Sequence, residues 1–509
     1  MGVEFPESPD GRRSTSALGR SVVADALRAV DPAGAEAVAR ESDWRRGYLA
    51  SFRRLIEAGL PSSDAAVSVA QAGLASLHQR MRCVLGDGTE AELSTVTSAP
   101  AAGPAPATVT VSGHGEAERA LAIPYRGERL SDDALLRQLD DWVGRGIIEP
   151  SCAEAVRSVA KHPEWLALTG RTVVVLGAGA EVGPLPVLLG WGARVVGVDL
   201  AVPAVWSRVL EVARRGAGTL ELPVSGGGAD LAERAGLDLG ADIPAVADWL
   251  AAIEGPLVLG NYVYAAGAAN VRVASAVDAL TMRMWAARPD VTLAFLATPT
   301  DVFAVPPDAV AQSQRAFADR PLAMKLARTT SGGRLFRPAY PPGRPGSPGS
   351  GDGPGINDSL VAQQGPNYAL AKRLQRWRAT LTRHAGGTVS LNVAPPTRTR
   401  SVLTNRALAA AYEGAPRFGV ETFDPATTRT LMAALLVHDL CAGPSGGGQP
   451  PRAHPWQDEA HAAAHGGLWR IPYAPRSALP VAALIGYPAS RRSGQRGEAG
   501  SRGLTRPVW

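Results

Sequence analysis

The sequence predicts an α/β protein built on a doubly wound parallel sheet, with a helical region before the sheet and an extension after it. Apolar, β-branched runs alternate with helical patterns between about residues 169 and 440, and this alternation is typical of parallel sheets. A glycine-rich turn follows the first run, and helical periodicity dominates the residues before it. The length of 509 residues allows about two or three domains.

The first part of the chain is expected to pack on the sheet without carrying chemistry. We expect residues 1–15 to be disordered and residues 16–168 to form a helical region, interrupted by a Pro/Ala/Gly-rich loop at 98–108. In that region Trp44 and Phe52 share an apolar helical face. This face predicts packing against the rest of the protein.

A strand, a glycine turn and a second strand follow. The continuous apolar run Thr172–Leu176 predicts a strand that is buried on both faces. Asp199 ends the second predicted strand, 22 residues after Gly177, where a dinucleotide site places the acid that bonds an adenosine ribose. The turn between them contains three glycines that allow a phosphate to approach a helix N-terminus: Gly177, Gly179 and Gly183.

Further helices and strands alternate after Asp199. Residues 301–367 then interrupt the alternation as a long insertion, in which the Pro/Gly/Ser-rich stretch 340–355 is expected to be mobile. A long loop at such a point is more often functional than idle. The expected helices are 203–215, 241–253 and 270–287, and the expected strands are 219–224, 257–261 and 291–297.

The helix that begins near Tyr368 carries a second informative pattern. Tyr368 and Lys372 lie four residues apart and share one face, away from the apolar stripe of the helix. Only three of the 52 basic residues are lysine, so a lysine retained here favours a specific need for its ammonium group. Four arginines of this helix are expected to form a polar face: Arg373, Arg376, Arg378 and Arg383.

The last part of the chain continues with a strand at 388–393 and two further helices. Residues 441–487 are expected to form a C-terminal cap packed around aromatic side chains, and residues 488–509 a disordered, basic tail. The aromatic residues of the cap are Trp456, Trp469 and Tyr473.

Together these motifs resemble the short-chain dehydrogenase/reductase family, whose sheet is Rossmann-like, over about residues 170–440. The family's turn T-G-x-x-x-G-x-G is similar to Leu176–Gly183, with leucine for threonine and Glu181 for the middle glycine. Tyr368-Ala-Leu-Ala-Lys372 matches the catalytic Tyr-x-x-x-Lys. Three looser matches resemble the family's adenine-contacting dipeptide, its Asn-Asn-Ala-Gly motif and its Pro-Gly loop: Ala241-Asp242, Asn261 to Gly267, and Pro395-Pro396 followed by Thr397.

The resemblance implies an enzyme that transfers a hydride between a nicotinamide and a carbonyl or alcohol. Tyr368 would be the acid or base, and Lys372 would stabilise its phenolate and bond the nicotinamide ribose. The family's catalytic Ser or Thr at the end of the fifth strand would be Thr298 or Thr300, with Ser359 as a third candidate. The family's helix asparagine would be Asn270.

The expected cofactor is NAD, with NADP as a second possibility, because the Asp199 carboxylate would repel a 2′-phosphate. The expected partner is a small-molecule substrate. The resemblance also implies a homo-oligomer assembled through the helices after the fourth and fifth strands. The residues expected to bind the cofactor are Gly177, Gly179, Gly183, Asp199, Asp242, Asn261, Gly267, Lys372, Pro395 and Thr397.

Composition and spacing argue against several other classes of protein. The net charge of +5 is spread along the chain, so nucleic acid is not an expected partner. No apolar run reaches the roughly 20 residues that span a bilayer, and no secretory leader is evident, so we expect a cytoplasmic protein without a membrane partner. Neither the cysteines nor the histidines suggest a metal site or a disulfide: Cys83, Cys152, Cys441, His454, His461 and His465.

Two alternatives stay open. The first is a nucleotide-binding scaffold or sensor without oxidoreductase activity, favoured by Glu181 in the glycine turn and by the long separation of Thr298 from Tyr368. The second is an S-adenosylmethionine-dependent methyltransferase, which uses a similar strand–turn–helix unit followed by an acid. That chemistry has no need for Tyr368 and Lys372.

Overall fold

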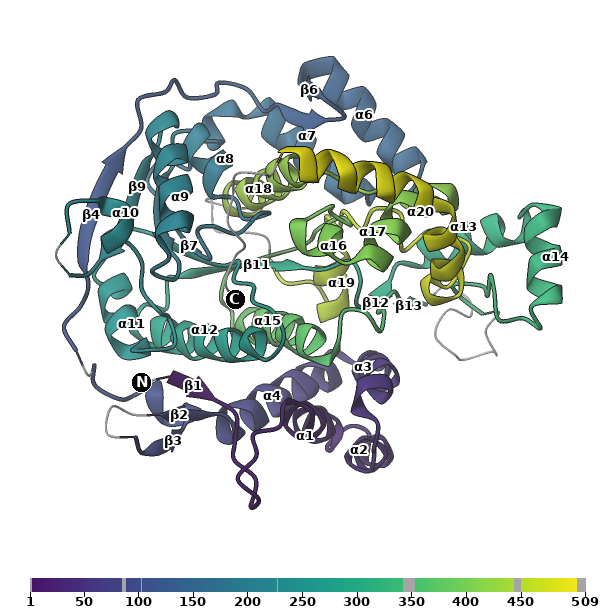
Figure 1. Cartoon of the computed structure of the whole chain (residues 1–509), viewed down its shortest axis with the longest axis horizontal. Helices are drawn as coiled ribbons and strands as arrows, with labels where there is room; N and C mark the ends of the chain where they lie inside the picture. The colour runs from purple at the N-terminus through teal and green to yellow at the C-terminus, as the bar shows by residue number, and fades with distance from the viewer. Residues whose placement is uncertain are drawn as a thin grey trace.

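A seven-stranded sheet lies at the centre of the molecule, with strand order β14-β11-β10-β7-β8-β9-β4 (Figure 1). The computed structural model describes residues 2–84, 88–101, 103–226, 228–341, 353–443 and 450–500. Six strands run parallel, while β4 lies antiparallel to β9 at one edge. The strands are β4 (Ala107–Ser112), β7 (Thr172–Leu176), β8 (Arg194–Val198), β9 (Thr219–Val224), β10 (Leu257–Asn261), β11 (Thr292–Ala297) and β14 (Val389–Val393).

Helices cover both faces of the sheet and enclose two apolar cores. In β7, Val174 and Leu176 enter one core, whereas Val173 and Val175 enter the other. This two-sided burial explains the continuous apolar runs, and it confirms the predicted α/β class with a mostly parallel sheet. One face carries α11 (Ile243–Ala251), α12 (Ala268–Ala287) and α15 (Pro366–His384), and the other carries α8 (Leu185–Gly190), α9 (Pro203–Arg215) and α18 (Pro425–Cys441).

Four N-terminal helices form a layer against α12 and α15 (Figure 1). The Asp278 carboxylate of α12 joins the layers, because it accepts hydrogen bonds from Arg378 of α15 and lies 2.7 Å from Nε2 of His78 in α4. The chain's own helices therefore occupy the surface of α12 and α15 through which an oligomer is expected, and the oligomer stays a prediction. These helices are α1 (Thr15–Leu27), α2 (Pro32–Ala39), α3 (Trp44–Gly59) and α4 (Ser63–Arg80).

The predicted helical region 16–168 is divided between the two faces, because α6 (Asp132–Gly144) and α7 (Pro150–Lys161) belong to the core that contains α18. It also includes the sheet strand β4, which begins at Ala107 within the predicted loop 98–108. Sequence reasoning missed β4 because this edge strand is largely exposed and lacks a continuous apolar run.

Described residues at both ends for which disorder is predicted belong to helices and strands. β1 (Gly2–Glu4) pairs with β2 (Arg82–Val84), and the Arg13 guanidinium anchors the following turn on the Phe5 carbonyl. At the other end, α20 runs from Pro475 to Gly500 and packs along α17 (Arg406–Gly414), where Gly486 permits close approach of the two backbones. Residues 501–509 lie outside the described residues.

The insertion begins after the end of β11, and its last residues lie close to its first. Its strands β12 (Val302–Val305) and β13 (Gly355–Asp358) pair antiparallel, and α13 (Pro307–Ala318) and α14 (Leu322–Thr330) lie between them. Most of the stretch 340–355, for which mobility is predicted, lies outside the described residues. The paired strands hold the two ends of the insertion together.

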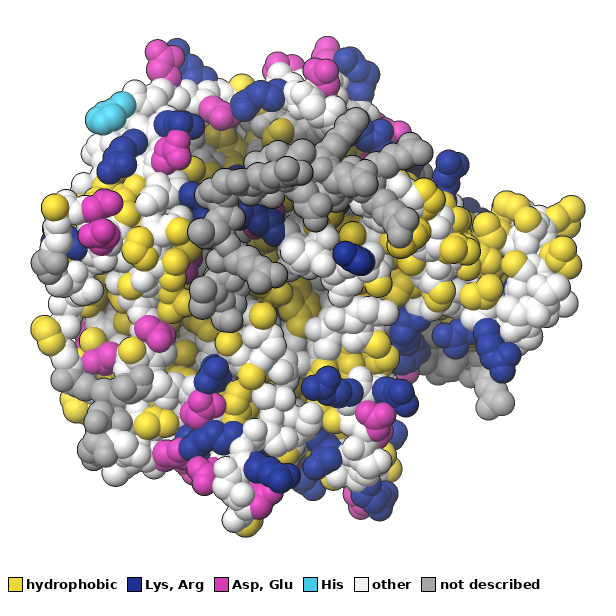
Figure 2. Space-filling model, in the orientation of Figure 1, with side chains coloured by type: hydrophobic (Ala, Val, Ile, Leu, Met, Phe, Trp, Pro, Cys, Tyr) yellow, Lys and Arg dark blue, Asp and Glu magenta, His cyan; other side chains and the backbone are white. Residues whose placement is uncertain are grey.

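The surface shows charges of both signs interspersed on the face seen in Figure 2, while apolar side chains gather on the arm formed around α14. Leu322 and Leu326 of α14 are 80% and 65% exposed. Within the described part of the chain, no helix has the length and apolar composition needed to cross a bilayer.

Candidate functional site

The candidate site lies at the carboxyl ends of β7 and β10. These adjacent parallel strands continue to opposite sides of the sheet, since β7 is followed by β8 on one side and β10 by β11 on the other. Open α/β sheets bind ligands at this kind of switch point. The glycine turn, the loop that follows Asn261 and the end of β11 meet here.

Gly177 places the turn directly against the end of β10. Its φ of 89° is in the left-handed region, and a Cβ atom would lie 2.9 Å from the carbonyl oxygen of Tyr262. Only glycine fits both the conformation and this close approach. Gly183 is buried within the turn, whereas Gly179 is exposed and lies beside Asp199.

Most N–H groups of the turn already have partners within the protein. The N–H groups of Gly177 and Ala178 donate to the Val198 carbonyl, and that of Gly179 donates to Asp199 Oδ2 at 2.8 Å. Helix α8 begins only at Leu185, and two residues at its start lack N–H groups: Pro184, which precedes the helix, and Pro186, its second residue. The turn thus offers an anion fewer donors than the sequence predicts.

Asp199 is held by the backbone at the end of β8. Its two carboxylate oxygens accept hydrogen bonds from Gly179 N and Leu200 N, each at 2.8 Å. Burial raises the pKa of Asp199 despite these bonds. A carboxylate has about four acceptor positions, so this group retains capacity for hydroxyl donors such as those of a ribose.

Glu181 turns its carboxylate away from the interior of the turn. Its Oε2 accepts a hydrogen bond from Arg400 N at 3.0 Å, at the start of α16 (Arg400–Thr404). Its carbonyl oxygen accepts two hydrogen bonds from the Arg429 side chain in α18. The residue that departs from the glycine pattern therefore ties the turn to the segments after β14.

Tyr368 lies against the end of β11. Burial raises the pKa of its phenol to about 12, and a hydrogen bond with Thr298 opposes this rise. The ring of Tyr264 meets the Tyr368 ring edge-on, with centroids 6.2 Å apart. The structure thus brings Tyr368 and Thr298 together, although they are far apart in the sequence.

Lys372 is fixed by two acceptors one helical turn beyond Tyr368. Its Nζ donates to the Leu296 carbonyl at 3.0 Å and to Gln375 Oε1 at 3.1 Å. Gln375 Nε2 in turn donates to Asn261 Oδ1 at 3.2 Å. Burial lowers the pKa of Lys372 to about 8. Gln375 was missed from the sequence, because nothing in its spacing signals a link to β10.

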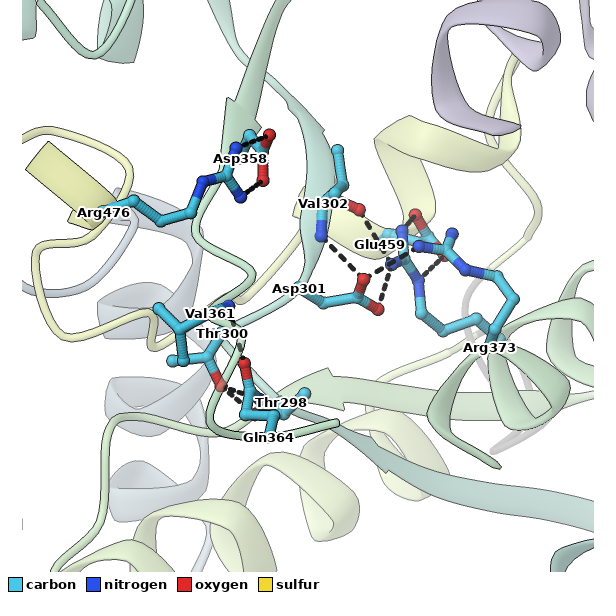
Figure 3. A network of polar contacts seen from close by, with 11 residues as sticks. Thr298, Thr300, Asp301, Val302, Asp358, Val361, Gln364, Arg373, Glu459 and Arg476 are labelled. Carbon is cyan, nitrogen blue, oxygen red and sulfur yellow. Dashed lines mark hydrogen bonds and ion pairs between the residues drawn. The ribbon is translucent and has the colours of Figure 1, made fainter. Parts of the chain in front are cut away.

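Thr300 supports Thr298 in a chain of hydrogen bonds (Figure 3). The Oγ1 atoms of the two threonines are 2.9 Å apart, and Gln364 Nε2 donates to Thr300 at 2.7 Å. Gln364 Oε1 accepts from Val361 N. The last residues of the insertion therefore contact the segment directly after β11, where the insertion begins. Ser359 is fully buried and donates to Asn357, a contact within the insertion.

Three of the four arginines on α15 are buried, so the polar face predicted for them is wrong. Arg373 and Arg376 both bond the buried Asp301 carboxylate, and Arg376 also forms two hydrogen bonds with Glu459 (Figure 3). Sequence periodicity missed this network, because its carboxylates come from the insertion and the cap. The network fixes α15 behind Tyr368.

The remaining predicted residues have structural contacts. Asp242 caps α11 by accepting from Ala245 N at 3.0 Å, and Asn270 accepts from Ala265 N at 3.1 Å. Thr397 donates to the Pro395 carbonyl and lies 2.7 Å from the Thr428 hydroxyl. Gly267 precedes α12 with a φ of 59°. None of these contacts directs a side chain to Tyr368.

Two neighbouring cavities share Arg452 and His461, and neither is lined by the candidate residues. A groove of about 450 Å³ is bordered by Arg452, Trp456 and His461, and a cavity of about 20 Å³ beside it also includes Asp439. His465 is buried and lies 2.8 Å from Glu149. Throughout the described ranges, no three His, Cys, Asp or Glu side chains are grouped to hold a metal ion.

A scan of protein-family models, a search of curated proteins and a search of solved structures each found no match to this chain.

Proposed function

We propose that this chain is an NAD(P)-dependent oxidoreductase of the short-chain dehydrogenase/reductase type, acting on a carbonyl or alcohol. The observation that carries the proposal is the position of Lys372 one helical turn beyond Tyr368, with its Nζ bonded to the Leu296 carbonyl near the end of the fifth parallel strand, where the Thr298 hydroxyl acts to lower the pKa of Tyr368. Numbered along the chain, the six parallel strands have the order 3-2-1-4-5-6, which is the Rossmann order of dinucleotide-binding sheets.

Tyr368 is suited to donate a proton to a carbonyl oxygen. Its pKa of about 12 keeps the phenol protonated at neutral pH, and its contact with Thr298 provides a second hydroxyl for the same substrate oxygen. The Lys372 ammonium stabilises the phenolate that remains after proton transfer, because opposite charges attract strongly in a site shielded from water.

A nicotinamide dinucleotide, when bound, supplies or accepts the hydride. Asp199 has acceptor positions left for the adenosine ribose. The negative charge of Asp199 favours NAD over NADP. The donor set fits the ribose end of the cofactor better than its diphosphate, for which the turn has few free N–H groups.

A non-catalytic nucleotide-binding protein is the second candidate. The observation that favours it is the internal pairing of the turn, together with a Lys372 ammonium that donates to Leu296 and Gln375. Such a protein would bind a nucleotide without turnover.

Titration of the purified protein with NADH, NADPH and S-adenosylmethionine tests the proposal. We expect a saturable heat of binding and a rise in Tm with NADH, a weaker effect with NADPH and none with S-adenosylmethionine. Asp199→Ala should weaken NADH binding more than NADPH binding, because it removes both the ribose acceptor and the repulsion of the 2′-phosphate. Binding of S-adenosylmethionine alone would replace the proposal with a methyltransferase.

A further inference from the structure

Arg429 of α18 extends its side chain to the glycine turn. Its Nε and one terminal nitrogen donate to the Glu181 carbonyl oxygen, at 3.2 Å and 2.8 Å. Its other terminal nitrogen has no hydrogen bond among the described residues. The guanidinium is half-buried and is held at the turn through two of its nitrogens.

This cation has no carboxylate partner within 4 Å in the part of the chain that the structure describes. Burial lowers the pKa of Arg429, and the Glu181 carboxylate opposes this only at longer range while bonded to Arg400 N. By contrast, Arg376 and Arg378 are ion-paired with Asp301 and Asp278. A partly desolvated charge without a counter-ion costs free energy unless a ligand supplies one.

Arg429 lies beside a turn whose own N–H groups are mostly bonded within the protein. The N–H groups of Gly177, Ala178, Gly179, Ala180 and Gly183 donate within the protein. The following helix α8 is short, and Pro184 and Pro186 remove two more donors at its start. An anion at this turn therefore needs positive charge from another element.

We propose that Arg429 is the main binding group for the diphosphate of the dinucleotide. This inference rests on the proposed function, and it assigns to α18 the electrostatic role that a glycine turn ordinarily fills with backbone N–H groups. The planar guanidinium can give two parallel hydrogen bonds to phosphate oxygens. The contact with the Glu181 carbonyl holds the guanidinium beside the turn.

Calorimetric titration of three variants with NADH, ADP and adenosine tests this assignment. Arg429→Met removes the charge with little change in volume, Arg429→Lys keeps the charge but loses the fork, and Arg137→Met makes the same charge change at an exposed position on α6. We expect Arg429→Met to weaken NADH and ADP binding at least about tenfold while adenosine binding changes less than about twofold. Arg429→Lys should fall between, and Arg137→Met should match the wild type.

The dependence of NADH affinity on salt gives a second readout, because removal of an ionic contact with the diphosphate should reduce the slope of log Kd against log salt concentration. Equal weakening of adenosine and NADH, with an unchanged slope, would show a structural role for Arg429 and overturn the assignment. If the wild type binds ADP through Arg429 but not NADH, the proposed function fails while the anion site stands. Absence of ADP binding as well would overturn both.

Discussion

Tyr368 and Thr298 lie 70 positions apart in the sequence, yet the Thr298 hydroxyl is close enough to the phenol to act on its pKa. Sequence patterns supplied the residue types, because a phenol and an ammonium four residues apart share a helical face. They left the partner hydroxyl open among three residues. The choice among these three hydroxyls depends on the structure, because the paired strands of the insertion bring Gln364 back to Thr300, to which it donates a hydrogen bond.

Tyr368→Phe isolates the role of the phenol. The substitution removes one oxygen and leaves the ring contact with Tyr264. We expect turnover to fall by about 10² to 10⁴-fold, the usual contribution of a general acid, while the Kd for NADH changes less than about twofold. Steady-state kinetics and calorimetry measure the two effects, and a fully active Tyr368→Phe protein would remove this residue from the mechanism.

Lys372 gives the site a dependence on pH. Because the pKa of Lys372 is lowered to about 8, its positive charge is present below that pH and is lost above it. Carbonyl reduction should therefore decline as the pH rises through about 8. In Lys372→Arg the side chain stays charged, so the decline should move to much higher pH even if the rate is lower. Identical pH profiles of the two proteins would contradict the electrostatic role.

At the scale of elements, the order of helices and strands after residue 169 followed from their apolar patterns. Thr172–Leu176 and Thr219–Val224 have the predicted bounds because they are buried strands that end at clear breaks. The apolar patterns could not predict contacts between residues that lie far apart in the sequence. β4 was missed because it is an exposed edge strand. The arginines of α15 were predicted to be solvated because the carboxylates that pair with them belong to other elements.

Asp278 tests how the N-terminal helices are joined to the sheet. Arg378 and His78 both contact its carboxylate, so Asp278→Ala leaves a buried arginine without its partner. We expect the free energy of unfolding to fall by about 3–5 kcal/mol in denaturant titrations. Asp290→Ala removes an exposed ion pair with Arg288 and should cost less than about 1 kcal/mol. Equal losses in the two variants would refute this role.

The same contact has a predictable pH dependence. Arg378 and His78 lower the pKa of Asp278 in the folded protein, although burial opposes them. The folded state then binds fewer protons than the unfolded state in the acidic range, so stability should fall with pH below about 4. Asp278→Ala should lose this part of the acid dependence, which unfolding curves recorded at several pH values would reveal.

At the scale of the whole molecule, the residues that the proposed reaction needs lie at one edge of the sheet, where the parallel strands end. Asp199 follows β8, Asn261 ends β10, and Tyr368 lies near Thr298 just beyond β11. The N-terminal helices cover α12 and α15, while the cap supplies Glu459 to the network behind α15. These additions stabilise the frame that positions the site.

The structure of the protein crystallised with NADH is the most direct test that this edge is a single cofactor site. The account predicts the nicotinamide ring within about 4 Å of the Tyr368 phenol, the adenosine ribose on Asp199 and the diphosphate beside Arg429. A dinucleotide bound elsewhere, such as in the groove lined by Trp456 and His461, with the glycine turn empty, would contradict it.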